Sequence, residues 1–275
     1  MTAPSLLALT TLDGQSPRYL DKAASLALAM NARLRLAYCG DGSGLFDAPL
    51  ARLAQRTRRL ARLFGVPVEM VEEDIRSNDV LRRHVAQSTL TCLSRAALTP
   101  VHARRTRDLL GRLLDLRSAP VLVVRPDTQA PYRKVLVPVS LSADSVSLVQ
   151  WAMALGSEAT IDIFHAADHG FMSVDARFEA CRRMGELTRG LHSPDRPFRY
   201  TVAHGPVQVA IAQEQRGRQQ DLVVLGDRPR SPWWRLCRPP LAWTLPAALP
   251  VDVLVVPRPR VDGALRWASP WRTAT

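Results

Sequence analysis

The feature that most constrains this sequence is a pattern that occurs twice. The apolar run Val121–Val124 reads V-L-V-V, and residues 253–256, which lie 132 positions further along, read V-L-V-V again. Each run follows a segment that contains proline, and each leads into another proline. Short apolar runs bounded by turn residues predict buried strands. Because a long-period repeat indicates duplicated structure, we expect the two halves of the chain to share one fold.

The elements around these runs also repeat in the same order. Expected strands are residues 6–12, 33–37, 67–71 and 89–93 in the first half, and 135–139, 160–164, 198–202 and 222–225 in the second. Expected helices are residues 19–30, 49–64 and 79–86, and then 145–155, 175–191 and 207–216. Alternating strands and helices predict parallel sheets covered on both faces. We therefore expect an α/β fold of two tandem open parallel-sheet domains, residues 1–126 and 132–260, with a C-terminal tail at 261–275.

The charge of the chain is strongly basic, and its distribution limits what this implies. The 275 residues include 37 Lys and Arg against 25 Asp and Glu, a formal charge of +12, and only Lys22 and Lys134 are lysines. A basic chain can attract nucleic acid or an anionic membrane. The excess is +7 in residues 1–130 and +5 in residues 131–275, so neither half is a basic arm. Dispersed charge is typical of a solvated surface and does not favour a nucleic-acid partner.

The sequence lacks the common signatures of a membrane span, a metal site or a hydrolase. No apolar stretch reaches the roughly 18 residues of a membrane span, and the N-terminus does not resemble a signal peptide, so we expect a cytoplasmic protein without a transmembrane segment. Cys39, Cys92, Cys181 and Cys237 form no C-x-x-C pair, which predicts buried thiols rather than zinc ligands or disulfides. Walker, G-x-S-x-G and H-E-x-x-H motifs are absent. We expect no metal and no catalytic residue, which favours a protein that is not an enzyme.

Three segments resemble the universal stress protein family. They are D-L-V-V-L-G at residues 221–226, V-L-V-P-V at 135–139 and P-V-D-V-L-V-V at 250–256, so the resemblance is strong in the second half and weaker in the first. It implies a Rossmann-like domain of the adenine-nucleotide alpha-hydrolase type in each half. It also implies that the final strands of two domains can pair, either inside this chain as a pseudo-dimer or between the chains of a homodimer.

Nucleotide-binding members of that family carry a loop of the form G-x-x-G-x9-G-[S/T] after the fourth strand. Glycines there let backbone N–H groups approach phosphate oxygens. In the second half this spacing falls on Gly226, Pro229, Pro239 and Pro240, and in the first half on Ser94, Ala97, Arg107 and Asp108. Proline has no N–H to donate. The loop spacing is therefore kept while the phosphate-binding chemistry is lost.

The family also places an Asp at the end of the first strand. Asp13 fits that place, the second half has Ser140 there, and Asp13 and Gly226 are the two remaining candidates for cofactor binding. An Asp-Gly turn is an alternative explanation for Asp13. His165 ends the second strand of the second half, where the family often has His, and the first half has Cys39. We expect His165 to be a histidine with satisfied hydrogen bonds rather than a base.

A Trp and Arg-rich stretch, residues 228–243, has no place in the phosphate loop. Its side chains Trp233, Trp234, Arg235 and Trp243 are candidates for binding a partner protein, because Trp and Arg dominate protein interfaces. The alternatives are that the tryptophans fill space left by a lost nucleotide, or that they stack on bases or contact a membrane surface.

Taken together, the resemblance and the altered loops favour a non-enzymatic universal stress response protein that acts by binding an unknown protein partner and needs no cofactor. The alternative is a protein that binds ATP or another adenine nucleotide, or a weak ATPase. It would use Asp13, Gly226 and nearby arginines in an altered phosphate loop, because arginine forks can replace backbone donors.

Overall fold

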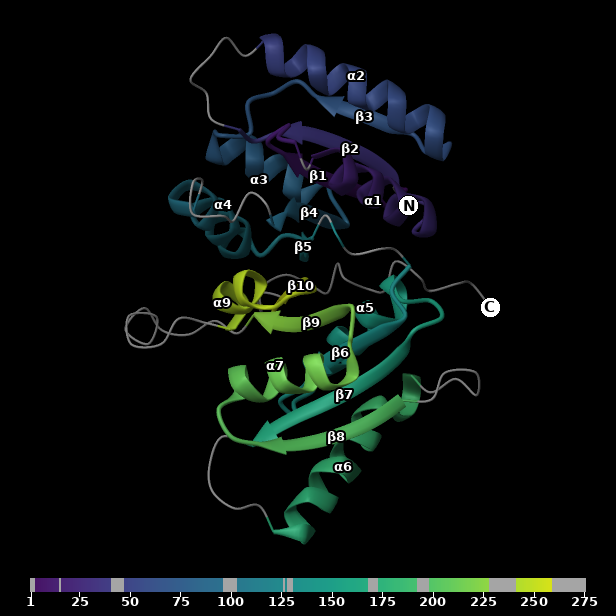
Figure 1. The fold of residues 1–275 in the computed structure, drawn as a ribbon, viewed down its shortest axis with the longest axis vertical. Helices are drawn as coiled ribbons and strands as arrows, with labels where there is room; N and C mark the ends of the chain where they lie inside the picture. The colour runs from purple at the N-terminus through teal and green to yellow at the C-terminus, as the bar shows by residue number, and fades with distance from the viewer. Residues whose placement is uncertain are drawn as a thin grey trace. The chain divides into compact units, whose positions relative to one another are not determined.

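The chain divides into two units, with the break between Ala130 and Pro131. The computed structural model describes residues 3–14, 16–40, 47–95, 103–125, 127, 131–167, 173–191, 198–227 and 241–258 (Figure 1). The break lies between the domain limits that the sequence predicts, residues 126 and 132.

The first unit is an open parallel sheet with helices between its strands. Its elements are β1 (Ser5–Thr10), α1 (Ser16–Ala29), β2 (Arg33–Tyr38), α2 (Asp47–Phe64), β3 (Val68–Val71), α3 (Asn78–Ala86), β4 (Leu90–Ser94), α4 (Ala103–Leu116) and β5 (Val121–Val124). The strands pair in the order β3-β2-β1-β4-β5, and every pairing is parallel.

The second unit repeats this arrangement. Its elements are β6 (Lys134–Pro138), α5 (Ser145–Leu155), β7 (Thr160–Ala167), α6 (Val174–Thr188), the 3-10 turn η2 (Arg189–Leu191), β8 (Phe198–His204), α7 (Val207–Arg218), β9 (Leu222–Asp227), α9 (Leu241–Ala248) and β10 (Asp252–Pro257). Its strands pair in the order β10-β9-β6-β7-β8, again all parallel. The predicted α/β class with two tandem parallel sheets is confirmed.

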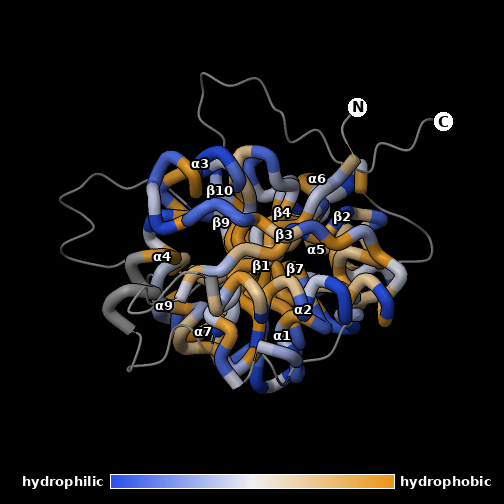
Figure 2. Tube along the Cα trace, turned by 90° about the horizontal axis from the view of Figure 1, so that it is seen from above, coloured by the Kyte–Doolittle hydropathy of each residue, from blue (hydrophilic) through white to orange (hydrophobic). Residues whose placement is uncertain are grey.

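The core of each unit lies on its central strands. Residues 6–9 of β1 and 135–137 of β6 are fully buried, as expected for parallel strands with helices on both faces. Strands β1, β4 and β7 accordingly appear in the hydrophobic colour of Figure 2. In the first unit α1 packs on β1 and β2, and α2 packs on β2 and β3 beside α1.

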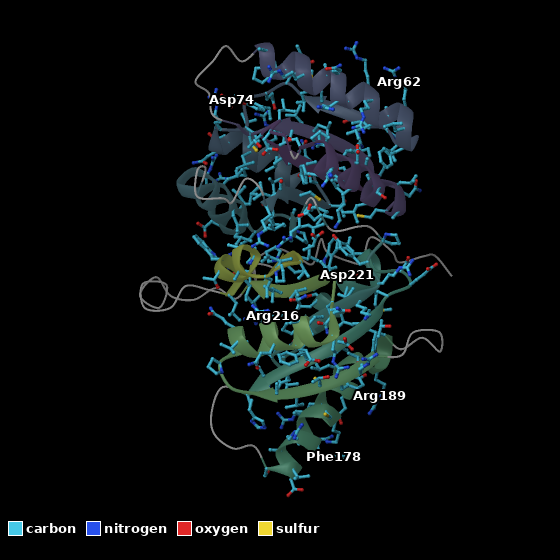
Figure 3. All side chains as sticks on the ribbon, viewed as in Figure 1. Arg62, Asp74, Phe178, Arg189, Arg216 and Asp221 are labelled. Atoms are coloured by element: carbon cyan, nitrogen blue, oxygen red, sulfur yellow. The ribbon has the colours of Figure 1, made fainter. Side chains whose placement is uncertain are left out.

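The start of the second unit is fixed by two acidic residues. Asp221, labelled in Figure 3, accepts hydrogen bonds from the backbone N–H groups of Arg133 (2.8 Å) and Lys134 (3.1 Å). The Tyr132 hydroxyl donates to Oδ2 of the buried Asp252 at 2.6 Å. The acidic residue that opens the D-L-V-V-L-G segment therefore has a structural task, which is to hold the first residues of β6.

Among the described residues, no helix is both long enough and apolar enough to cross a membrane.

Candidate functional site

Each sheet has one point at which the chain changes direction across the sheet. In open α/β folds, ligands bind beside such a point, beyond the carboxyl ends of the strands. The point lies between β1 and β4 in the first unit and between β6 and β9 in the second. The segments that follow these four strands therefore form the candidate site of each unit.

Asp13, in the segment after β1, is engaged by the chain itself. Its Oδ1 accepts from the backbone N–H of Ser16 at 2.9 Å and from the Ser16 hydroxyl at 3.0 Å. Its Oδ2 accepts from the Thr11 hydroxyl at 2.8 Å. Because Ser16 is the first residue of α1, the Asp13 carboxylate caps that helix, as short acidic side chains commonly do. Both carboxylate oxygens are thus used within the turn.

The segment after β6 has the same backbone conformation. Leu12 and Leu141 both have positive φ angles, 57° and 58°, and the next helix begins four residues after each of them. This match makes Ser142 the counterpart of Asp13. The prediction that Ser140 takes the place of Asp13 is therefore wrong by two residues. The Asp-Gly pair was misleading for aligning the two segments, because in both units the residue with the left-handed conformation is a leucine.

The end of the second strand shows a similar shift of one residue. Nδ1 of His165 lies 3.0 Å from the carbonyl oxygen of Val139, which follows the last residue of β6, just as His165 follows Phe164, the residue opposite that last residue. Thr10 is the first-unit counterpart of Val139, and the residue opposite Thr10 is Tyr38. The counterpart of His165 is therefore Tyr38. The prediction from the sequence that it is Cys39 is wrong by one residue. The contact agrees with a histidine that has a satisfied hydrogen bond, but the prediction that His165 ends the strand is wrong, because β7 continues to Ala167.

Cys39 is not a nucleophile in this setting. Its burial raises the pKa of the thiol to about 12, and the nearby Asp13 carboxylate acts in the same direction. A thiol reacts as the thiolate, so Cys39 stays protonated and unreactive at neutral pH. Within the described ranges, His, Cys, Asp and Glu side chains form no group of three that suits a metal ion.

Gly226 does not behave as part of a glycine-rich loop. It is a strand residue of β9, paired with Val256, and its φ is not in the left-handed region. A Cβ at this position would lie 3.5 Å from Leu148, an ordinary contact, so the backbone does not require glycine here. The next residue, Asp227, is buried, and a carboxylate there disfavours a phosphate.

The first unit differs at the corresponding positions. Its counterpart of Gly226 is Ser94, whose hydroxyl is buried and has no hydrogen-bond partner among the described residues. Arg95 follows Ser94, and Arg125 follows Val124. Because Ser94 pairs with Val124, the two arginines are neighbours at the carboxyl edge of the sheet. Burial lowers the pKa of Arg95, and the adjacent Arg125 charge lowers it further. Arg95 of the first unit thus stands where the second unit has Asp227.

The rest of the predicted phosphate-loop spacing can be compared only in part. Residues 96–102 and 228–240 lie outside the described residues. Arg107 and Asp108 lie inside helix α4, so these two positions of the expected phosphate-loop spacing are helical. The helix starts early because residues 109, 110, 113 and 114 are leucines at helical spacing, and all four are buried.

The predicted partner-binding residues are also only partly described. Trp233, Trp234 and Arg235 fall outside the described residues, and Trp243 is half-buried in the first turn of α9. That helix is tied to α7 by the Gln208 side chain, which donates to the Thr244 hydroxyl at 3.2 Å.

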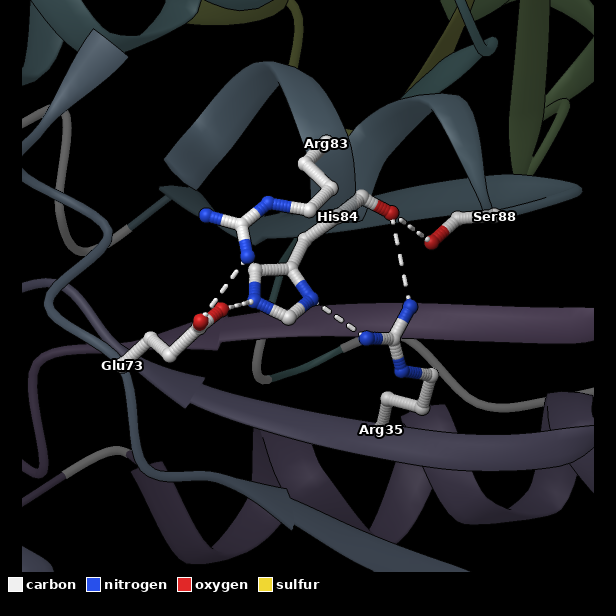
Figure 4. A network of polar contacts seen from close by, with 5 residues as sticks. All are labelled: Arg35, Glu73, Arg83, His84 and Ser88. Carbon is white, nitrogen blue, oxygen red and sulfur yellow. Dashed lines mark hydrogen bonds and ion pairs between the residues drawn. The ribbon is translucent and has the colours of Figure 1, made fainter. Parts of the chain in front are cut away.

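One polar network was not expected from the sequence (Figure 4). His84 on α3 is almost buried, and its Nε2 lies 2.5 Å from Oε2 of Glu73, while its Nδ1 contacts the Arg35 guanidinium of β2. Because arginine can only donate, Nδ1 accepts and Nε2 carries the proton. The hydrogen bond from His84 lowers the pKa of Glu73, and Arg83 acts in the same direction. Both ring nitrogens are occupied, so the network is structural.

The model of the universal stress protein family matches residues 131–257. No curated protein matches the chain.

Solved structures resemble the whole fold at low sequence identity. A universal stress protein from Archaeoglobus fulgidus DSM 4304 is 14% identical, with a TM-score of 0.66 over 92% of this chain and 96% of its own. A candidate universal stress protein from Pseudomonas aeruginosa UCBPP-PA14 is 20% identical, with a TM-score of 0.58 over 93% and 94%. The cytoplasmic domain of a prokaryotic cation chloride cotransporter is 12% identical, with a TM-score of 0.57 over 92% and 95%. At these identities the likeness concerns the fold, which serves more than one kind of protein.

Proposed function

We propose that the chain is a tandem member of the universal stress protein family, whose model matches residues 131–257, and that it acts by binding protein partners and is not an enzyme. Its nucleotide sites are vestigial. The observation that carries the proposal is the carboxyl edge of the second unit, where Gly226 is an ordinary strand residue and buried Asp227 follows it. A triphosphate would meet a carboxylate at this edge instead of a nest of N–H donors.

Two further observations support the loss of both sites. The Asp13 carboxylate is used to cap α1, so it is not directed at a ligand. In the sequence, Pro229, Pro239 and Pro240 replace residues whose N–H groups would otherwise hold phosphate oxygens. The partner-binding role of Trp233, Trp234, Arg235 and Trp243 remains part of this proposal.

A second candidate function rests on the first unit. The adjacent Arg95 and Arg125, beside the buried Ser94 hydroxyl, form a basic edge that suits a phosphate group. Two guanidinium groups can hold phosphate oxygens without backbone donors. In this alternative the first unit binds ATP or another adenine nucleotide through arginine side chains, and the second unit does not.

Calorimetric titration of the full chain with ATP and Mg²⁺ separates the two functions. We expect no binding up to millimolar nucleotide. Micromolar binding would contradict the vestigial site. If such binding is lost in R95Q/R125Q and kept in R82Q/R177Q, which removes two exposed arginines elsewhere, the first-unit candidate is the correct one.

A further inference from the structure

Helix α2 carries an unusual concentration of positive charge. Its 18 residues contain five arginines, at positions 52, 56, 58, 59 and 62, and a single acidic residue, Asp47. The helix packs on the sheet through Leu53 and Leu60, which are fully buried. Arg52, Arg58 and Arg62 are exposed, Arg56 is half-buried, and Arg62 is labelled at the end of the helix in Figure 3. The arginines therefore occupy the solvent-facing side of an amphipathic helix.

Only one of these arginines is neutralised within the described part of the chain. Arg59 forms a bidentate ion pair with Asp21 of α1, at 2.9 and 3.1 Å. Arg62 donates to the backbone carbonyl of Arg58 at 3.4 Å. Across the described ranges, Arg52, Arg56, Arg58 and Arg62 have no carboxylate partner.

The duplicated helix of the second unit provides an internal comparison. Helix α6 occupies the place of α2, and its 15 residues contain three arginines and three acidic residues. Arg182 pairs with Glu179 and Glu186, and Arg183 pairs with Glu179. Among the described residues, α6 thus neutralises two of its three arginines with its own carboxylates, whereas on α2 only Arg59 has a carboxylate partner, and that partner lies on α1.

We propose that the exposed arginine face of α2, formed by Arg52, Arg56, Arg58 and Arg62, is a docking surface for an acidic helical segment of a partner protein. On α6 two arginines pair with glutamates of the same helix. On α2 the partner segment would supply the carboxylates, with Glu residues three and four positions apart, the spacing at which Arg and Glu pair on helices. The proposal rests on the proposed function, since it names a surface and a partner class for a protein that acts by binding.

A protein partner fits this surface better than a nucleic acid. Leu63 is 63% exposed and lies in the same row of the helix as Arg52 and Arg56, so the basic face includes an apolar contact. α2 exposes no aromatic side chain on which bases could stack; its one aromatic residue, Phe64, is half-buried. Arginine together with an exposed apolar side chain is typical of protein interfaces.

The test uses the full chain and a fluorescein-labelled, amidated helical peptide of Glu, Ala and Leu, with Glu three and four residues apart. R52Q/R58Q/R62Q removes three exposed ion pairs with the peptide, each of modest strength. We therefore expect this variant to bind the peptide roughly ten-fold more weakly than the unsubstituted chain. The matched control R82Q/R177Q/R216Q removes three other exposed arginines and the same net charge, and it should change the affinity less than about two-fold. Both variants should keep the far-ultraviolet circular dichroism of the parent, because all six arginines are exposed.

Several outcomes would overturn the proposal. The first is an unsubstituted chain that does not bind the peptide, and the second is an equal loss in both variants, which would indicate net charge alone. The third is tighter binding of poly-U RNA or of phosphatidylserine vesicles than of the peptide, lost in R52Q/R58Q/R62Q, which would make the face a nucleic-acid or membrane surface. Titration with ATP and Mg²⁺ should give the same result for R52Q/R58Q/R62Q and for the parent. The proposal of a docking surface and the proposal of vestigial nucleotide sites can therefore be contradicted separately.

Discussion

Asp13 shows how a side chain at the expected place of a ligand-binding residue can have a structural role instead. Its carboxylate accepts hydrogen bonds from the backbone N–H and hydroxyl of Ser16 and from the Thr11 hydroxyl. Loss of such a cap costs about 1 kcal/mol of stability. We therefore expect Asp13→Ala to lower the free energy of unfolding by about that amount, measured by urea denaturation at pH 7.

Ser142 offers the matched control for this experiment. It is the counterpart of Asp13 in the second unit, and its hydroxyl contacts only the exposed Ser140 hydroxyl, at 3.0 Å, among the described residues. Ser142→Ala should change the free energy of unfolding by less than about 0.5 kcal/mol. Equal effects of the two substitutions would contradict a capping role for Asp13.

At the scale of elements, α2 and α6 show how two copies of one helix diverged. On α6, the hydrogen bond from Arg182, followed by that from Arg183, lowers the pKa of Glu179 to about 2. A carboxyl group whose pKa is lowered by folding stabilises the fold above its unfolded pKa, near 4.3, and this contribution is lost as the pH falls toward the folded value.

The predicted consequence is a pH-dependent effect of Glu179→Gln. The variant should be less stable than the parent at pH 6, and the difference should shrink as the pH falls from about 4.5 toward 2. Urea denaturation along a pH series measures it, and high salt should weaken it because the groups are exposed. Glu158→Gln, at an exposed position without an ion pair in the described structure, should show no such trend. A difference that stays constant with pH would contradict the role of the two arginines.

The strands could be predicted from the sequence because each is a short apolar run between turn residues, whereas helices α4 and α9 were not predicted. The predicted second strand of each half, for example, agrees with β2 and β7 within three residues at each end. The site was predicted less well. A left-handed leucine such as Leu12 or Leu141 leaves no signal in the sequence, since this conformation is unusual for a branched side chain. Asp-Gly at residues 13 and 14 suggested the wrong register for this reason.

Contacts between distant residues account for the other omissions. The network of Arg35, Glu73 and His84 joins a strand, a loop and a helix. No short sequence motif indicates that these three side chains lie close together in the fold. The adjacency of Arg95 and Arg125 follows only when the pairing of Ser94 with Val124 is known.

At the scale of the whole molecule, duplication has produced two units with one fold and different surface chemistry. The carboxyl edge of the first sheet carries Arg95 and Arg125, and that of the second carries buried Asp227. An apolar sheet tolerates such changes because the residues at and beyond its strand ends contribute little to its core. The two units therefore share one fold although the residues at the carboxyl edges of their sheets differ.

The V-L-V-V strands make the last prediction, which concerns assembly. In each unit this strand pairs with the strand before it, β5 with β4 and β10 with β9. A long apolar strand edge left open is prone to aggregation, so we expect these edges to be covered, within one chain as a pseudo-dimer or between two chains as a homodimer.

Light scattering and hydrogen exchange together test this expectation. A mass of 30.5 kDa with slow amide exchange in both strands supports pairing within one chain, and twice that mass with slow exchange supports a homodimer. A single-chain mass with rapid exchange at residues 121–124 and 253–256 would contradict both. The two strands have the same sequence. If only one of them were protected from hydrogen exchange, its partner would have to recognise residues that differ between the units, such as those at the carboxyl edges of the two sheets.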